Sequence, residues 1–75
     1  MIVVTGAAGF IGSCLVGRLN REGQNSLVIV DAFSNPVKEK NLLGKTYFQK
    51  IDREEFHAWL DKNHNIVDMI FHIGA

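Results

Sequence analysis

Short apolar runs and stretches of helical periodicity alternate along the whole chain. Ile2–Thr5 and residues 27–30 are rich in β-branched side chains and lack polar alternation, which predicts two strands buried on both faces. Residues 47–51 are partly polar, which suits a strand at the edge of a sheet. Residues 66–73 form the last apolar run and predict a fourth strand.

Three helices are expected between these strands. Residues 10–22 carry apolar side chains at intervals of three and four, and Gly23 stands where a helix C-cap is expected. Residues 38–43 predict a short helix closed by Gly44, after a loop over residues 32–36. Residues 53–62 predict a third helix, with Asp52 as its N-cap, Glu55 as the capping-box partner, and an apolar face made by Phe56, Trp59 and Leu60.

The order of these elements indicates an α/β fold. Strands that alternate with helices favour a parallel sheet with right-handed crossovers, here with strand order 3-2-1-4. A loop at His64 and Asn65 leads into the last strand. No linker or internal repeat divides the chain, so residues 1–75 are expected to form one Rossmann-type unit.

Composition narrows the class of protein. With 47% hydrophobic and 21% charged residues, the 75-residue chain is not of the disordered type. Eight basic and eight acidic side chains cancel, so nothing in the charge favours nucleic acid or a membrane surface. The single cysteine, Cys14, excludes an internal disulfide and a zinc-ligand cluster. Because no signal-peptide pattern or long apolar run is present, we expect a cytoplasmic protein.

The first strand runs directly into a glycine-rich turn, Thr5-Gly6-Ala7-Ala8-Gly9-Phe10-Ile11-Gly12. Gly6 permits a tight turn, Gly9 lets a pyrophosphate approach the backbone, and Gly12 lets the helix lie close to the sheet. The backbone amides of Phe10 and Ile11, at the positive end of the helix dipole, then face the phosphates.

An acidic residue, Asp31, follows the second strand at the distance expected of a dinucleotide-binding fingerprint. A carboxylate there can accept hydrogen bonds from ribose hydroxyls. The alternative is a glycine turn that only packs a helix on a sheet, with Asp31 as an ordinary acid. The combined pattern of strand, glycines, helix and acid favours a nucleotide site.

These motifs resemble the extended short-chain dehydrogenase/reductases, the family of NAD-dependent epimerases and dehydratases. Two motifs of that family are similar to segments here: Thr-Gly-x-x-Gly-x-x-Gly near the start of the chain, and Phe71-His72-Ile73-Gly74-Ala75 at the end of its last strand. The resemblance covers the whole chain. Shorter matches around Asp31, Asn41 and Arg53 are nearest to the subfamily of ADP-heptose 6-epimerases. Enzymes of this family are several times longer, so the resemblance implies the N-terminal part of a dinucleotide-binding domain.

The resemblance implies an isomerase of lipopolysaccharide-core assembly that epimerises a nucleotide-activated sugar by transient hydride transfer. It implies NADP as cofactor, a nucleotide sugar bound by the remainder of the enzyme, and a homo-oligomer. The family commonly has asparagine where Ala32 stands and lysine where Arg53 stands. Carried over residue by residue, the implied cofactor-binding positions are Gly6, Gly9, Phe10, Ile11, Gly12, Asp31, Ala32, Lys38, Arg53 and Ala75.

Several alternatives stay open. NAD is the alternative cofactor, because the Asp31 carboxylate would repel a 2′-phosphate unless Lys38 and Arg53 offset it. Other activities within the family are a UDP-sugar 4-epimerase, a dehydratase and a deoxysugar reductase, and a non-catalytic nucleotide-binding module is the alternative outside it. The family's Tyr-x-x-x-Lys pair is missing, since Tyr47 is followed four residues later by Ile51, so we expect a structural Tyr47 and no catalysis by this chain.

The remaining candidates have ordinary structural interpretations. Cys14 lies among apolar neighbours and is expected to be a buried, inert thiol. We expect His72 to be packed or hydrogen-bonded, and His57 and His64 to face solvent. The last strand is expected to leave one edge of the sheet open, which favours marginal stability and self-association.

Overall fold

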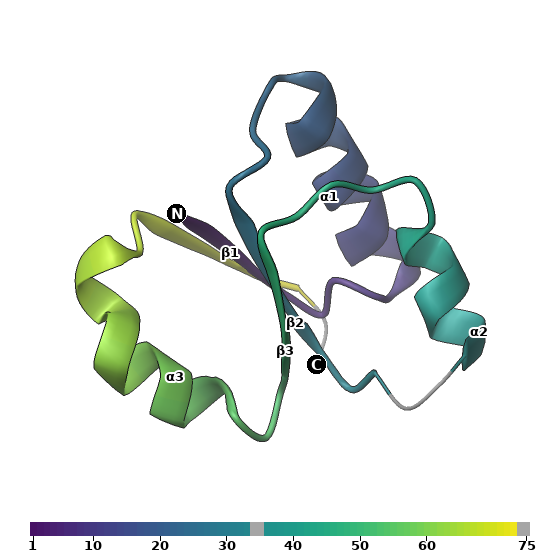
Figure 1. The fold of residues 1–75 in the computed structure, drawn as a ribbon. Coiled ribbons are helices and arrows are strands. Elements are labelled where there is room, and N and C mark those ends of the chain that lie inside the picture. The colour runs from purple at the N-terminus through teal and green to yellow at the C-terminus, as the bar shows by residue number, and fades with distance from the viewer. Residues whose placement is uncertain (34–35, 74–75) are drawn as a thin grey trace.

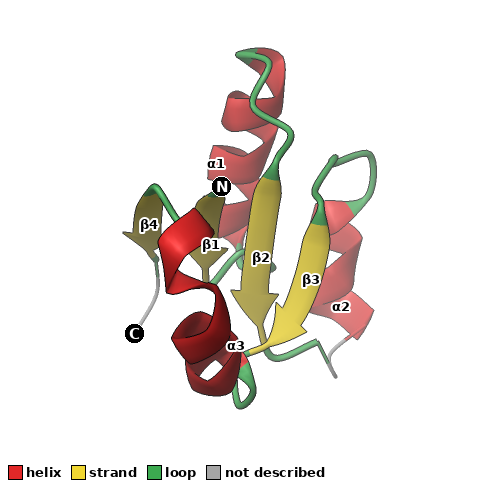
Figure 2. Cartoon of the chain, turned by 60° about the vertical axis from the view of Figure 1, so that its left-hand side comes forward, coloured by secondary structure: helices red, strands yellow, loops and turns green. Residues whose placement is uncertain are grey.

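Four parallel strands form the centre of the computed structural model, which describes residues 1–33 and 36–73 (Figure 1). They are β1 (Ile2–Thr5), β2 (Leu27–Asp31), β3 (Gln49–Asp52) and β4 (Met69–His72). The sheet order is β3-β2-β1-β4, which confirms the predicted order and fold class. All three pairings are parallel, so the carboxyl ends of the strands meet at one end of the sheet (Figure 2).

Helices cover both faces of the sheet. Helix α1 (Phe10–Arg21), α2 (Pro36–Glu39) and the 3-10 helix η1 (Lys40–Leu42) lie on one face, and α3 (Phe56–Asn63) lies on the other (Figure 2). Successive side chains of a strand point to opposite faces, so each central strand contributes to two apolar layers. Toward α1 and η1 the buried set is Val4, Ala7, Ala8, Val16, Leu19, Leu27, Ile29 and Leu42. Toward α3 it is Val3, Val28, Val30 and Ile51, with Phe56 and Trp59 packed against it as expected.

The buried side of α1 differs from the predicted apolar stripe. Buried positions are Gly12, Ser13, Val16 and Leu19, whereas Phe10 and Ile11 are largely exposed. The expectation of a buried Cys14 was wrong, because its thiol is exposed. Cys14 lies two positions from both Gly12 and Val16, and residues two apart do not share a helix face.

The end of α1 has the predicted glycine cap. Gly23 has φ of 86° and donates its N–H to the carbonyl of Asn20, while Gln24 donates to the carbonyl of Leu19. These two bonds make a Schellman motif, which satisfies carbonyls that the helix itself leaves without donors.

The next helical segment begins earlier than predicted. Pro36 was placed in a loop, but it is the first residue of α2, where its fixed φ and missing N–H suit a helix start. The 3-10 helix η1 continues from it to Leu42, so the expected single helix over residues 38–43 is two short pieces. Residues Ser34 and Asn35 of the predicted loop lie outside the described residues.

Helix α3 begins at Phe56, three residues later than predicted. Asp52 is the last residue of β3, and its Oδ1 accepts from the N–H of Glu54 at 3.1 Å, so it closes a turn before the helix. Glu55 occupies the N-cap position and makes no side-chain cap bond, so the predicted capping box is absent from this described segment.

The two outer strands are shorter than the apolar runs suggested. Tyr47 precedes β3 and packs half-buried against the α1 layer, which confirms a structural residue but not its place in the strand. His64 and Asn65, predicted as a loop, form a 3-10 helix with Ile66, and β4 starts only at Met69.

No helix within residues 1–33 and 36–73 has the length and apolarity needed to cross a membrane.

Candidate functional site

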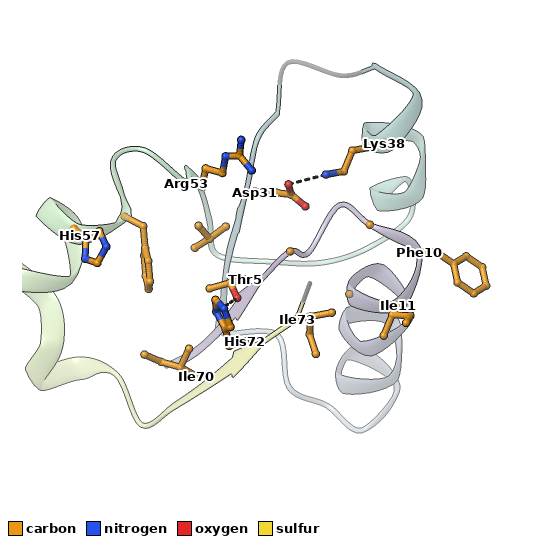
Figure 3. A pocket seen from close by; sticks show the side chains of 15 residues that line it. Thr5, Phe10, Ile11, Asp31, Lys38, Arg53, His57, Ile70, His72 and Ile73 are labelled. Atoms are coloured by element: carbon orange, nitrogen blue, oxygen red, sulfur yellow. Dashed lines mark hydrogen bonds and ion pairs between the residues drawn. The ribbon is translucent and has the colours of Figure 1, made fainter. Parts of the chain in front are cut away.

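A groove of about 790 Å³ opens at the carboxyl ends of the strands (Figure 3). The glycine turn after β1 forms one wall, and residues at the ends of β2 and β4 form the floor. The start of α3 and the segment before it complete the opposite side. In an open parallel sheet, ligands bind outside the carboxyl ends of the strands, so the fold places this groove where a ligand is expected.

The glycine turn is shaped by backbone hydrogen bonds. Gly6 has φ of 68°, which a residue with a β-carbon rarely adopts, so this position requires glycine. Ala7 donates its N–H to the carbonyl of Val30 at 3.3 Å, and Gly9 donates to the carbonyl of Gly6 at 3.2 Å. These bonds fold the chain back toward the sheet before α1 begins.

Gly12 is required by close packing of α1 on this turn. A β-carbon built at Gly12 would lie 2.1 Å from the carbonyl oxygen of Gly6 and 2.9 Å from the Cα of Ala7. Both neighbours are backbone atoms, which cannot move aside as a flexible side chain can. The predicted role of Gly12 is therefore consistent with the geometry.

Gly9 differs from Gly6 and Gly12, because neither its backbone conformation nor its packing within the protein requires a glycine. Its φ of −73° and ψ of 172° suit any residue, and a β-carbon there would meet its nearest neighbour, the oxygen of Gly6, at 3.4 Å. The space beside Gly9 is open groove. Gly9 is also the N-cap of α1 and supplies no side-chain cap, so the first-turn amides of Phe10 and Ile11 keep the free N–H groups of a helix start.

Asp31, at the end of β2, points toward the glycine turn and is only 6% exposed. Its Oδ2 accepts from the N–H of Ala8 at 2.9 Å, and its Oδ1 accepts from the N–H of Ala32 at 2.7 Å and from Lys38 Nζ at 2.9 Å (Figure 3). Burial alone would raise the pKa of Asp31, but the hydrogen bonds from Lys38, Ala32 and Ala8 outweigh it and hold the pKa below its ordinary value.

The far side of the groove combines one cation with apolar and imidazole side chains. Arg53 follows β3, lines the groove, and donates its backbone N–H to the main-chain carbonyl of Asp31 at 3.0 Å, so the two backbones lie side by side. His72 Nδ1 lies 2.9 Å from Thr5 Oγ1, so the expected hydrogen-bonded histidine is confirmed. His57 is exposed, as predicted, but it also lines the groove.

Most of the residues predicted for the site meet in this groove. Its lining includes Gly6, Gly9, Phe10, Ile11, Gly12, Asp31, Lys38 and Arg53. Ala32 is half-buried behind Asp31 and does not belong to that lining. Ala75 lies outside the described residues.

One side chain that contacts the glycine turn is not among the predicted site residues. Asn41, in η1, donates from Nδ2 to the carbonyl of Ala8 at 2.9 Å. The contact joins residues 33 positions apart, so neither periodicity nor local motif spacing points to it.

The model of the NAD dependent epimerase/dehydratase family matches residues 2–75. The chain belongs to this family. Two similar proteins are ADP-L-glycero-D-manno-heptose-6-epimerases: that of Brachyspira hyodysenteriae is 45% identical and that of Alkalilimnicola ehrlichii 38% identical. In each case the match covers 100% of this chain and 24% of the relative, so the chain spans about a quarter of their length.

A solved structure with the same fold is that of UDP-glucuronic acid 4-epimerase from Bacillus cereus, in complex with UDP-glucuronic acid and NAD. It is 33% identical with a TM-score of 0.72, over 99% of this chain and 26% of that one. The parallel sheet and its helices thus have the fold of a solved 4-epimerase, in agreement with the family match.

The residues of this groove fit a nicotinamide dinucleotide. The open backbone beside Gly9 and the free first-turn amides suit a diphosphate, which needs close approach and N–H donors. A volume of about 790 Å³ is within the range of cofactor pockets.

Proposed function

We propose that this chain binds the ADP portion of NADP, or alternatively of NAD, for a nucleotide-sugar epimerase. The observation that carries the proposal is the uncapped start of α1 beside Gly9, where no β-carbon limits the approach of a diphosphate. Anions bind at such helix starts because N–H groups and the helix dipole both point toward them.

The proposed residue roles are those that the family resemblance implies. Phe10 and Ile11 offer backbone amides to the diphosphate, with Gly6 and Gly12 shaping the turn that presents them. Asp31 and Ala32 flank the adenosine ribose, and Lys38 and Arg53 complete the adenosine side of the groove. Ala75 is proposed by resemblance alone to join the cofactor site.

Lys38 supports the choice of NADP. The Asp31 carboxylate would repel a 2′-phosphate, but its ion pair with Lys38 at 2.9 Å offsets that charge. Arg53 lines the same groove and adds a second cation to its lining. Together they provide partners for a phosphate on the ribose.

We propose ADP-heptose 6-epimerase as the activity this cofactor site serves, since the similar proteins of two different organisms carry that name. A bound nicotinamide dinucleotide would supply reversible hydride transfer with the sugar. Similarity to a UDP-glucuronic acid 4-epimerase makes a UDP-sugar 4-epimerase the second candidate. Tyr47 packs half-buried against the core and has Ile51 four residues on, so we propose that this chain holds cofactor without supplying the catalytic acid or base. Cytoplasmic location and homo-oligomerisation remain predictions.

Titration of the chain with ADP-ribose, with and without a 2′-phosphate, tests the proposal. We expect both to bind, the phosphorylated form more tightly, and Asp31→Ala to weaken the unphosphorylated form more. Failure of the wild-type chain to bind either compound would show that the groove is not a dinucleotide site.

A single variant then isolates the diphosphate contact. Gly9→Val keeps an allowed backbone conformation but places a branched side chain against the first-turn amides. Loss of one charge-assisted hydrogen bond corresponds to roughly a 10- to 100-fold weaker ADP-ribose affinity. Gly17→Ala, on the same helix outside the groove lining, should bind ADP-ribose like the wild type. Equal affinity of Gly9→Val and wild type would contradict the assigned diphosphate position.

A further inference from the structure

We propose that Asn41 is a positioning residue that holds the diphosphate-binding turn in its binding-competent shape. The inference rests on the proposed nucleotide function, because the turn it holds is the one assigned to the diphosphate. Asn41 itself does not line the groove, so it would act through the turn and not by touching the ligand.

The peptide unit between Ala8 and Gly9 is held at both ends. Its carbonyl oxygen accepts from Asn41 Nδ2 at 2.9 Å, and its N–H donates to the carbonyl of Gly6 at 3.2 Å. The preceding N–H, that of Ala8, donates to Asp31 Oδ2 at 2.9 Å. Three consecutive polar groups of the turn are thereby fixed in direction.

Such anchoring is needed because the turn has almost no side chains of its own. Between Thr5 and Phe10 it contains only glycine and alanine, and a glycine loses more conformational freedom on ordering than any other residue. Rotation of the peptide at Gly9 would redirect the amides of Phe10 and Ile11. A hydrogen bond that prevents this rotation lowers the entropy that ligand binding must otherwise remove.

Asn41 is well placed for this role because its own element is anchored. The neighbouring Leu42 is 7% exposed and belongs to the apolar layer under α1. The same helical segment, Pro36–Leu42, carries Lys38, which binds Asp31. Asn41 and Asp31 therefore hold Ala8 from both sides, and they tie the ribose side of the groove to the diphosphate side.

The experiment compares ADP with adenosine on the wild type and on Asn41→Leu, a side chain of similar size that cannot donate a hydrogen bond. If Asn41 positions the diphosphate turn, ADP affinity falls about five-fold, as expected for one neutral hydrogen bond, while adenosine affinity is unchanged. Amide hydrogen exchange of Gly9 in the ligand-free variant should rise by about the same factor.

Asn20→Leu is the matched control. Asn20 also bridges to the backbone, with Nδ2 donating to the carbonyl of Thr46 at 2.8 Å, but it does not line the groove or contact the glycine turn. The proposal is overturned if both variants lose ADP binding equally. It is also overturned if Asn41→Leu loses ADP and adenosine binding equally, or if Asn41→Leu binds ADP with wild-type affinity.

Two further outcomes are distinguishable. If the wild type binds no ADP, the proposed function fails. Faster Gly9 exchange in Asn41→Leu would still support the positioning of the turn by Asn41, and unchanged exchange would refute it. If Asn41→Leu does not fold, NMR of the wild type decides the matter. Slow exchange of an Asn41 side-chain amide proton supports the hydrogen bond to Ala8, and fast exchange of both protons overturns it.

Discussion

Replacing Gly12 by alanine tests the contact on which the position of α1 depends. An added β-carbon would lie 2.1 Å from the Gly6 oxygen, 2.8 Å from the Gly6 carbonyl carbon and 2.9 Å from the Ala7 Cα. Ordinary contacts begin at about 3.5 Å, so the helix start must retreat from the turn by roughly 1 Å or more. Because all three neighbours are backbone atoms, a rotamer change cannot relieve the clash.

Two opposed effects decide how much Gly12→Ala changes the free energy of unfolding. Overpacking costs about 1–3 kcal/mol, and three close contacts with the rigid Gly6–Ala7 peptide unit place Gly12→Ala near the upper end of that range. Alanine regains about 1 kcal/mol of helix propensity over glycine. The net expectation is a loss of about 2 kcal/mol, which for a domain of this size lowers the melting temperature by roughly 8–16 °C.

Gly17→Ala, on the same helix, is expected to stabilise the protein. There the nearest atoms to the added β-carbon all belong to the side chain of Lys45, with Cε closest at 3.1 Å, and this flexible side chain can move away. Helix propensity then dominates, and we expect a gain of roughly 0.5–1 kcal/mol. Urea unfolding followed by far-UV circular dichroism and by the fluorescence of Trp59 measures both variants. A Gly12→Ala midpoint at or above the wild type, or equal losses in the two variants, would refute the packing argument.

Two other predictions concern Asp31 and Cys14. The pKa of Asp31 is lowered on folding, so the carboxylate contributes stability above the unfolded pKa of about 3.9 and loses that contribution as pH falls through the folded pKa. Asp31→Asn should therefore show a weaker decline of unfolding free energy below about pH 4 than the wild type, and an unchanged decline would contradict the assignment. The exposed thiol of Cys14 should react with a soluble maleimide in the native chain as fast as in urea, apart from solvent effects, whereas protection in the native state would show that it is buried.

Local patterns were enough to predict the architecture. A strand buried on both faces must be apolar throughout, so Ile2–Thr5 and the run ending at Asp31 identified the two central strands directly. Gly6, Gly9 and Gly12 identified the turn because close approach and a left-handed backbone leave few residue choices. The carboxyl ends of neighbouring parallel strands lie at one end of the sheet, so the glycine turn and Asp31 were expected to meet there.

The ends of the helices and their buried faces were less predictable, because they depend on which residues pack against the rest of the fold. Helix α3 starts at Phe56 because the chain first turns through residues 52–55, where Asp52 binds Glu54 and not the helix. In α1 the apolar residues Phe10, Ile11 and Cys14 are all exposed, while Gly12 and Ser13 are buried. The helix turns its smallest residues inward there because the backbone of the glycine turn lies against it.

The sequence by itself determined the class of fold and the residue types at the groove, because strand, helix and turn patterns depend on neighbours within a few positions. The strand order then followed from the rules for strands that alternate with helices. Only the tertiary structure decided how the groove is held together. Asp31 turns its carboxylate onto Ala8 and Lys38, and Asn41 reaches Ala8 from the other side. The two bonds to Ala8 join residues 23 and 33 positions apart and have no periodic pattern, since they arise only when packing brings their elements into contact.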